Sequence, residues 1–138
     1  MTNRQKDWPS LSCPSSNGFR FWSHEWEKHG ACLESESQLE QHEYFEAALN
    51  LKKKVNLLQI LWIARIEPDD GFYSLDNIVR AIINGIGHTP RKECNEDSYG
   101  NSQLYQIYIC MDSSVLEIIE CPVPPKGRCA SKVQFPKF

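Results

Sequence analysis

Hydrophobic residues recur three or four positions apart over most of the first two thirds of the chain, and this spacing predicts helices. The predicted helices cover residues 21–29, 38–53, 55–65 and 75–86, and they follow an irregular polar stretch over residues 1–20. Gly30 and Gly87 stand where glycine commonly ends a helix, and Ser74 is suited to cap the start of the last one.

The residue pattern in the last third of the chain predicts strands instead of helices. They cover residues 91–95, 102–111, 115–121 and 130–135, and the AspSerSer sequence at 112–114 supplies a hairpin turn. Helices that precede a run of strands favour an α+β fold over alternating βαβ winding. We therefore expect helices followed by antiparallel strands, in a single domain over residues 1–138.

Charge and hydropathy narrow the classes of function. The net charge of -3 excludes binding of nucleic acid through a wide basic surface, although a small cleft can still receive it. The three lysines at 52–54 are the one basic run, and we expect them on a solvated helix face. No apolar stretch approaches the ~20 residues that span a bilayer, and no signal peptide is visible in the first ten residues.

Six cysteines are many for a chain of 138 residues. They are Cys13, Cys32, Cys94, Cys110, Cys121 and Cys129. None belongs to a CxxC pair, which argues against a zinc ribbon or a thioredoxin motif and favours a secreted, disulfide-bonded chain. Cys110 and Cys121 flank the predicted hairpin turn, so we expect them to pair across it.

The sequence FWSHEWEKHGAC, from Phe21 to Cys32, concentrates chemically active side chains on one predicted helix. At about 100° per residue, and with His24 at zero, Lys28 lies at about 40°, Glu25 at about 100° and His29 at about 140°. Two imidazoles, a carboxylate and an ammonium therefore converge on one helix face. Trp22 and Trp26 are four residues apart, as expected for side chains that anchor the helix.

This set of groups suits phosphoryl transfer. An imidazole can accept a proton near neutral pH, and a lysine with a second, protonated imidazole can hold phosphate oxygens as their charge grows. The neighbouring carboxylate keeps the histidines oriented or charged. If the substrate is RNA, the nucleophile is the ribose 2′-hydroxyl of the substrate itself. The reaction then needs no metal and no cofactor.

Three other interpretations compete for the same residues. A zinc protease of the HExxH type needs histidines four apart, whereas His24 and His29 are five apart and Lys28 would add positive charge beside the metal. A merely solvated helix face would be the favoured interpretation if these four residues stood alone. A thiol enzyme could use Cys32, but the many cysteines favour a disulfide there.

The whole string resembles the second conserved active-site segment of the T2-type ribonucleases, including the plant extracellular and S-like members. Further stretches resemble the family's lead-in to that segment and its C-terminal strands: WPSLSC at 8–13, ECN at 93–95, QLYQIYIC at 103–110, IIECP at 118–122 and FP at 135–136. The resemblance covers essentially the whole chain and implies a ribonuclease T2-like fold. Ala31 is a small departure, since the plant proteins usually carry Thr there.

The resemblance implies a role for each residue of the cluster. His29 would be the general base that accepts the 2′-hydroxyl proton, while Glu25 and Lys28 would stabilise the pentacoordinate phosphorane. His24 would help to bind phosphate, and Phe21 would lie against the base on the 3′ side of the cut. It further implies single-stranded RNA as substrate, a monomer without metal or cofactor, and an extracellular, secretory or vacuolar location.

The family's other active-site segment reads roughly FxxHGLWP, and its histidine protonates the leaving 5′-oxygen. This sequence does not contain it, and His42 and His88 are expected to be ordinary surface residues. We therefore expect a C-terminal portion of the fold that lacks the N-terminal part. Two functions stay open: endonucleolytic RNA cleavage to a 2′,3′-cyclic phosphate, or a catalytically impaired ribonuclease-like storage, defence or binding protein. A nonfunctional translated fragment is a third possibility.

The resemblance also implies how the remaining cysteines pair. It implies a Cys94–Cys129 disulfide that staples the last strands. In plant members the counterparts of Cys13 and Cys32 pair with upstream cysteines. In this chain they are expected to be unpaired, paired upstream or paired with each other.

Overall fold

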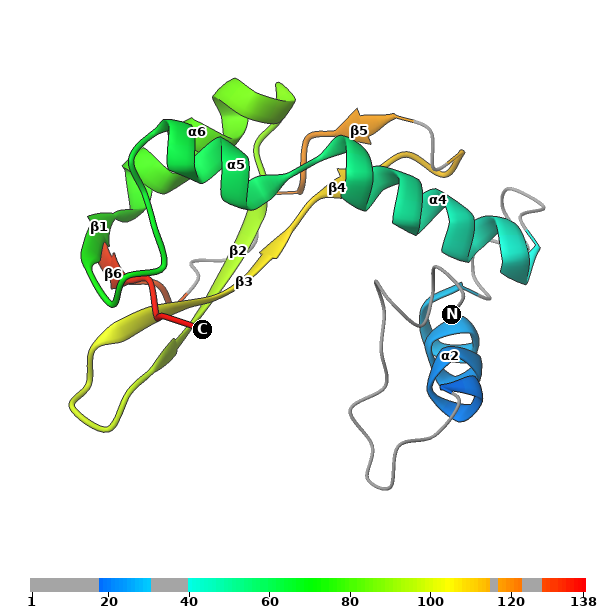
Figure 1. The fold of residues 1–138 in the computed structure, drawn as a ribbon, viewed down its shortest axis with the longest axis horizontal. Coiled ribbons are helices and arrows are strands. Elements are labelled where there is room, and N and C mark those ends of the chain that lie inside the picture. The colour runs from blue at the N-terminus through cyan, green and yellow to red at the C-terminus, as the bar shows by residue number, and fades with distance from the viewer. Residues whose placement is uncertain (1–17, 31–39, 115–116, 123–127) are drawn as a thin grey trace. The chain divides into compact units, whose positions relative to one another are not determined.

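A computed structural model describes residues 18–30, 40–114, 117–122 and 128–138 (Figure 1). The chain forms two compact units. The first contains Met1–Lys54 and Ser113–Leu116, and the second contains Val55–Asp112 and Glu117–Phe138. Cys13 and Cys32 lie outside the described residues.

The described part of the first unit is helical. Helix α2 (Phe19–Glu25) continues directly into the π-helix η1 (Trp26–Gly30), and helix α4 (Gln41–Lys54) packs against η1. Phe45 is the buried residue of α4, with 1% of its surface exposed, whereas the three lysines at the helix end are exposed as expected. The predicted helices over 21–29 and 38–53 are therefore present, with shifted ends.

Among the described residues, the second unit contains two further helices and six strands. They are α5 (Leu57–Ile63), β1 (Phe72–Ser74), α6 (Leu75–Ile86), β2 (Arg91–Glu96), β3 (Ser102–Tyr108), β4 (Cys110–Met111), β5 (Ile118–Ile119) and β6 (Lys132–Gln134). One sheet has the strand order β1-β6-β3-β2, and β4 and β5 form a separate two-stranded ribbon. Every pairing is antiparallel except a single parallel contact between β3 and β6.

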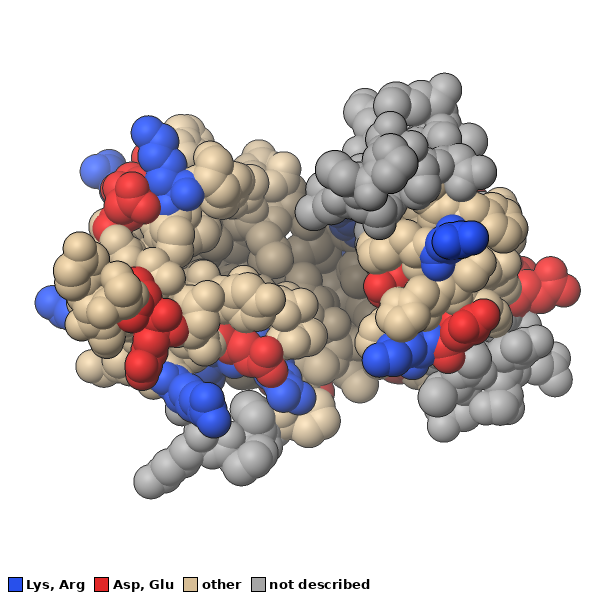
Figure 2. Space-filling view, turned by 90° about the horizontal axis from the view of Figure 1, so that it is seen from below, with Lys and Arg blue, Asp and Glu red and all other residues tan. Residues whose placement is uncertain are grey.

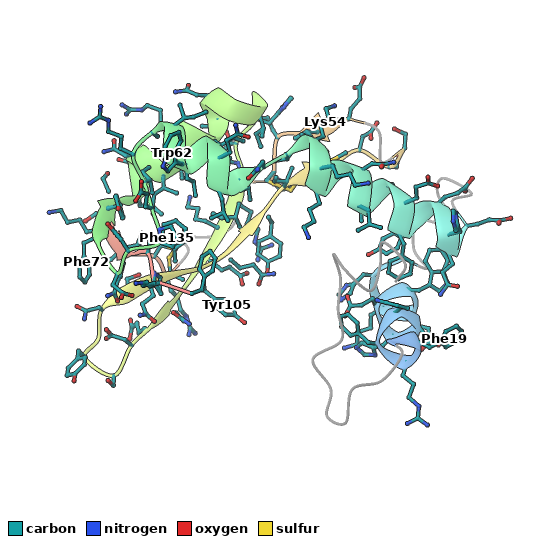
Figure 3. All side chains as sticks on the ribbon, in the orientation of Figure 1. Phe19, Lys54, Trp62, Phe72, Tyr105 and Phe135 are labelled. Atoms are coloured by element: carbon teal, nitrogen blue, oxygen red, sulfur yellow. A yellow bond between two sulfur atoms is a disulfide. The ribbon has the colours of Figure 1, made fainter. Side chains whose placement is uncertain are left out.

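The core of the second unit lies between its helices and the four-stranded sheet. Ile78 and Ile82 of α6 and Val133 of β6 are completely buried. The full cluster of buried residues is Leu61, Ile66, Ile78, Ala81, Ile82, Val133 and Phe135. By contrast, Trp62, Phe72 and Tyr105 are exposed (Figure 3). The helical spacing of isoleucines in the sequence thus identifies the face of α6 that packs on the core.

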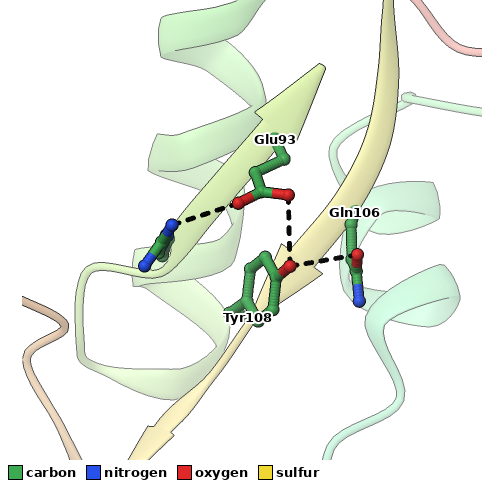
Figure 4. Close-up of polar contacts among 4 residues, drawn as sticks. Glu93, Gln106 and Tyr108 are labelled. Carbon is green, nitrogen blue, oxygen red and sulfur yellow. Dashed lines mark hydrogen bonds and ion pairs between the residues drawn. The ribbon is translucent and has the colours of Figure 1, made fainter. Parts of the chain in front are cut away.

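A polar network fixes the register of the β2–β3 hairpin (Figure 4). Arg91 donates to Glu93 at 3.1 Å, and the Tyr108 hydroxyl lies 3.1 Å from carboxylate Oε2 of Glu93 and 3.1 Å from Oε1 of Gln106. The Arg91 guanidinium lies 5.4 Å from the centre of the Tyr108 ring. Loss of water contact and the bond to Glu93 raise the pKa of the Tyr108 hydroxyl. These groups satisfy one another, so we assign the network a structural role.

Two disulfides of the second unit each join a strand residue, in β2 or β4, to a residue outside the strands. Cys94 bonds to Cys129, with their Cα atoms 5.1 Å apart, and Cys110 bonds to Cys121, with their Cα atoms 5.2 Å apart. In the ribbon that the second bond joins, Cys110 pairs with Ile119 and Met111 pairs with Ile118. Both bonds are the ones expected from the sequence.

Besides shifted element ends, the structure differs from the predictions in three features. Strand β1 was not predicted, the long strand over 102–111 is interrupted at Ile109, and Ser74 does not cap α6 through its side chain. Ser74 does occupy the N-cap position, but it is also the last residue of β1 and pairs with Lys132. Gly87 ends α6 as predicted, with φ of 80° and its N–H bonded to the Ile83 carbonyl.

Alanine substitutions at the two N-cap residues of this unit are expected to lower the free energy of unfolding by different amounts. Asn56 accepts a hydrogen bond from the Gln59 N–H at 3.1 Å, so Asn56→Ala is expected to lower the free energy of unfolding by about 1 kcal/mol. Ser74→Ala should lower the free energy of unfolding by less, because the Ser74 side chain makes no such hydrogen bond. Urea denaturation of both variants measures the difference, and an equal or larger loss at Ser74 would contradict it.

Candidate functional site

The active-site candidate is the continuous helix formed by α2 and η1. Gly18 begins it in the left-handed region, with φ of 78°, and its carbonyl accepts the Trp22 N–H at 3.0 Å. A side chain at Gly18 would lie within 2.9 Å of the Trp22 ring. Glycine is therefore required at this position both for its backbone conformation and for the close approach of Trp22.

The second half of this helix has π rather than α geometry, which changes the expected arrangement of the histidines. In a π-helix the repeating hydrogen bond joins residues five apart, and such turns occur frequently at functional sites. His24 and His29 are five apart, and η1 covers most of the path between them. We infer that the two imidazoles lie closer to a common face than the α-helical angle of about 140° predicts.

Gly30 is the last residue of the helical stretch, as predicted, but it also has a packing role that the sequence did not indicate. Its φ does not lie in the left-handed region, so it is not a left-handed helix terminator. Instead it is buried, and the ring of Trp26 lies so close to its Cα that a methyl group there would overlap ring atom Cε3. Glycine is needed because a tryptophan packs directly on the backbone.

Glu25 and His29 are brought together by this helix. Nε2 of His29 lies 4.0 Å from Oε2 of Glu25, and the His29 side chain is 61% exposed while that of Glu25 is 21% exposed. His24 and Lys28 are exposed and Phe21 is half-buried. The helix thus presents two imidazoles and an ammonium to solvent beside a carboxylate that is mostly shielded from it.

Tyr44 of α4 also belongs to this region, and the sequence did not single it out. Its ring contacts Trp26 with 5.6 Å between the ring centres. Burial, and secondly the charge of Glu25, raise the pKa of its hydroxyl. In the sequence, Tyr44 could have been noticed only because it directly precedes Phe45, the buried residue of α4.

The distribution of charged side chains agrees with the modest net charge. Figure 2 shows lysine and arginine interspersed with aspartate and glutamate on the face in view, without a continuous basic patch among the described residues there. Within the described ranges, no group of three or more His, Cys, Asp or Glu side chains is arranged to hold a metal ion. No helix in this described part of the chain is long and apolar enough to cross a membrane.

A helix with this set of groups, in a disulfide-linked α+β chain, is the kind of site that suits phosphodiester chemistry. The chain belongs to the ribonuclease T2 family, whose model matches residues 1–121. RNA cleavage is the function of this family. The family and fold predicted from the sequence are therefore confirmed.

Plant ribonucleases are among the similar proteins. The chain is 54% identical over 140 residues to intracellular ribonuclease LX of Solanum lycopersicum and 52% identical over 138 residues to extracellular ribonuclease LE of the same plant. The matches cover 100% of this chain but 57% and 60% of those proteins. The chain thus spans about three fifths of the length of these curated relatives.

A solved structure, that of RNase NT in complex with 5′-AMP, has the same fold. It superposes with a TM-score of 0.84 at 51% sequence identity, covering 98% of this chain and 66% of that one. The ligand of that structure, 5′-AMP, is a nucleoside monophosphate.

Proposed function

We propose that this chain carries the base and the phosphate-binding groups of an endoribonuclease that cleaves single-stranded RNA to a 2′,3′-cyclic phosphate. The observation that supports it most is the Glu25–His29 pair, at 4.0 Å, on an exposed helical turn that also presents Lys28. The proposal also draws on family membership.

In the proposed reaction, His29 accepts the proton of the ribose 2′-hydroxyl through its imidazole. The 2′-oxygen attacks the adjacent phosphorus, and the bond from phosphorus to the 5′-oxygen breaks. Lys28, beside Glu25 and the protonated His24, holds the phosphate oxygens as negative charge grows in the transition state. The departing 5′-oxygen takes up a proton from an acid outside this helix. Phe21 is proposed to contact the base on the 3′ side.

The proposed setting follows from the relatives and the cysteines. We propose a monomer that works without metal or cofactor in an extracellular, secretory or vacuolar compartment. The relatives include one extracellular and one intracellular plant ribonuclease, and the two disulfides fit an oxidising compartment.

Product analysis tests the proposed function. The disulfide-bonded chain is incubated at mildly acid pH with a ribodinucleotide, and with the same dinucleotide lacking the 2′-hydroxyl. We expect a 2′,3′-cyclic phosphate from the first substrate and no cleavage of the second. If neither is cleaved, this chain is not an active ribonuclease, and tight binding without cleavage would support a ribonuclease-like binding protein instead.

A further inference from the structure

An aromatic cluster joins the candidate catalytic helix to α4. Tyr44 contacts the Trp26 ring edge-to-face, with ring centres 5.6 Å apart and planes inclined at 64°. It also contacts its neighbour Phe45, with ring centres 5.2 Å apart. Phe45 is almost completely buried, so its position is set by packing. Tyr44 therefore connects this well-packed residue to Trp26, the first residue of the π-turn.

Trp26 is held at a second place by Gly30. The ring of Trp26 leaves no room for a side chain on Gly30, the last residue of the same π-turn. A shift of the Trp26 ring would therefore remove the close contact with Gly30. Contacts with Tyr44 and with Gly30 together fix the position of the ring, and the ring fixes the backbone on which His29 lies.

Tyr44 also lies within electrostatic reach of Glu25. Burial and the negative charge of Glu25 both raise the pKa of its hydroxyl, so the phenol stays neutral when the carboxylate is charged. Tyr44 can therefore support the helix without adding a charge that would compete with Lys28 or His29.

We propose that Tyr44 is a positioning residue for the Glu25–His29 pair, because its ring holds Trp26 and with it the π-turn that carries His29. This inference rests on the proposed ribonuclease function. A π-turn is a rare departure from the α-helix that occurs mostly as a single turn, frequently at functional sites. Without the Tyr44 ring, the turn is expected to relax and displace His29 from the attacking 2′-hydroxyl.

Kinetics of two substitutions test the role of the ring. Tyr44→Leu keeps an apolar side chain but loses the edge-to-face contact, and kcat is expected to fall about 10- to 100-fold with little change in KM. Tyr44→Phe keeps the ring and should retain most of the activity. An unchanged kcat in Tyr44→Leu, or a loss confined to KM, would overturn the proposal.

Titration of the Tyr44 hydroxyl tests its placement independently of catalysis. In protein labelled at the tyrosine ring carbons, the pKa of Tyr44 is followed by NMR and assigned with the Tyr44→Phe variant. Glu25→Gln should lower this pKa, whereas Glu27→Gln, an equal charge change at an exposed site on the same helix, should not. If Glu25→Gln leaves it unchanged, the positioning role is overturned.

The two proposals fail in distinguishable ways. Absence of RNA cleavage by the unmodified chain would overturn the proposed function, and the titration would still decide whether Tyr44 lies beside Glu25. Cleavage with a Tyr44 hydroxyl that does not respond to Glu25 would overturn the positioning role alone.

Discussion

Replacing His29 with alanine is expected to slow RNA cleavage about 10²- to 10⁴-fold, the usual contribution of a general base. The imidazole is exposed, and its Nε2 lies 4.0 Å from Oε2 of Glu25. The His29 side chain is 61% exposed, and substitutions at exposed positions usually change stability by only about 0.5 kcal/mol, so the variant should remain folded. Initial rates with a ribodinucleotide, together with a circular dichroism spectrum, measure both quantities.

His42 provides a matched control for this substitution. It is also an exposed histidine, with 73% of its side chain accessible, and its Nδ1 lies 3.6 Å from Oε2 of Glu46, four residues along the same helix. His42→Ala therefore removes the same chemical group from a similar pair in the same unit. Its cleavage rate should equal that of the unmodified chain. Equal losses in both variants would remove the special role assigned to His29.

Local patterns in the sequence were sufficient to predict the helices and the hairpin ribbon. The buried residues Ile78 and Ile82 recur at helical spacing, and Gly87 supplies the left-handed end, so α6 could be placed from its own residues. Strand β1 could not be found this way. It has three residues, too few to show a period of two, and it exists because Phe72 pairs with Gln134, far away in the sequence.

The residues of the candidate site were predictable, but the geometry that relates them was not. The motif and the helical wheel placed His24, Glu25, Lys28 and His29 on one face of an α-helix. In the π-turn, Trp26 packs against Gly30 and against Tyr44 of another helix. Tertiary contacts of this kind leave no mark in the period of the sequence, which is why the packing role of Gly30 was not predicted.

Removal of the Cys94–Cys129 disulfide should have the largest effect on the stability of the second unit. The bond closes a loop of 35 residues, and the paired alanine variant is expected to lose about 4 kcal/mol through the added entropy of the unfolded chain. Both cysteines also pack against the buried cluster that contains Ile82 and Val133, so alanine removes contacts there as well. Single domains are stable by only about 5–15 kcal/mol, which makes this loss a substantial fraction.

The Cys110–Cys121 bond supplies the comparison, because the paired alanine variant removes the same chemical groups. Its sequence separation is 11, for which the loss is about 3 kcal/mol, and it joins the separate β4–β5 ribbon rather than the four-stranded sheet. Amide hydrogen exchange in β2 and β3 reports on the sheet of the second unit alone, which matters because the chain contains two compact units. Sheet amides should exchange faster in the Cys94/Cys129 variant than in the Cys110/Cys121 variant. The reverse order would mean that the Cys110–Cys121 disulfide at the short ribbon, and not the Cys94–Cys129 disulfide at β2, limits opening of the sheet.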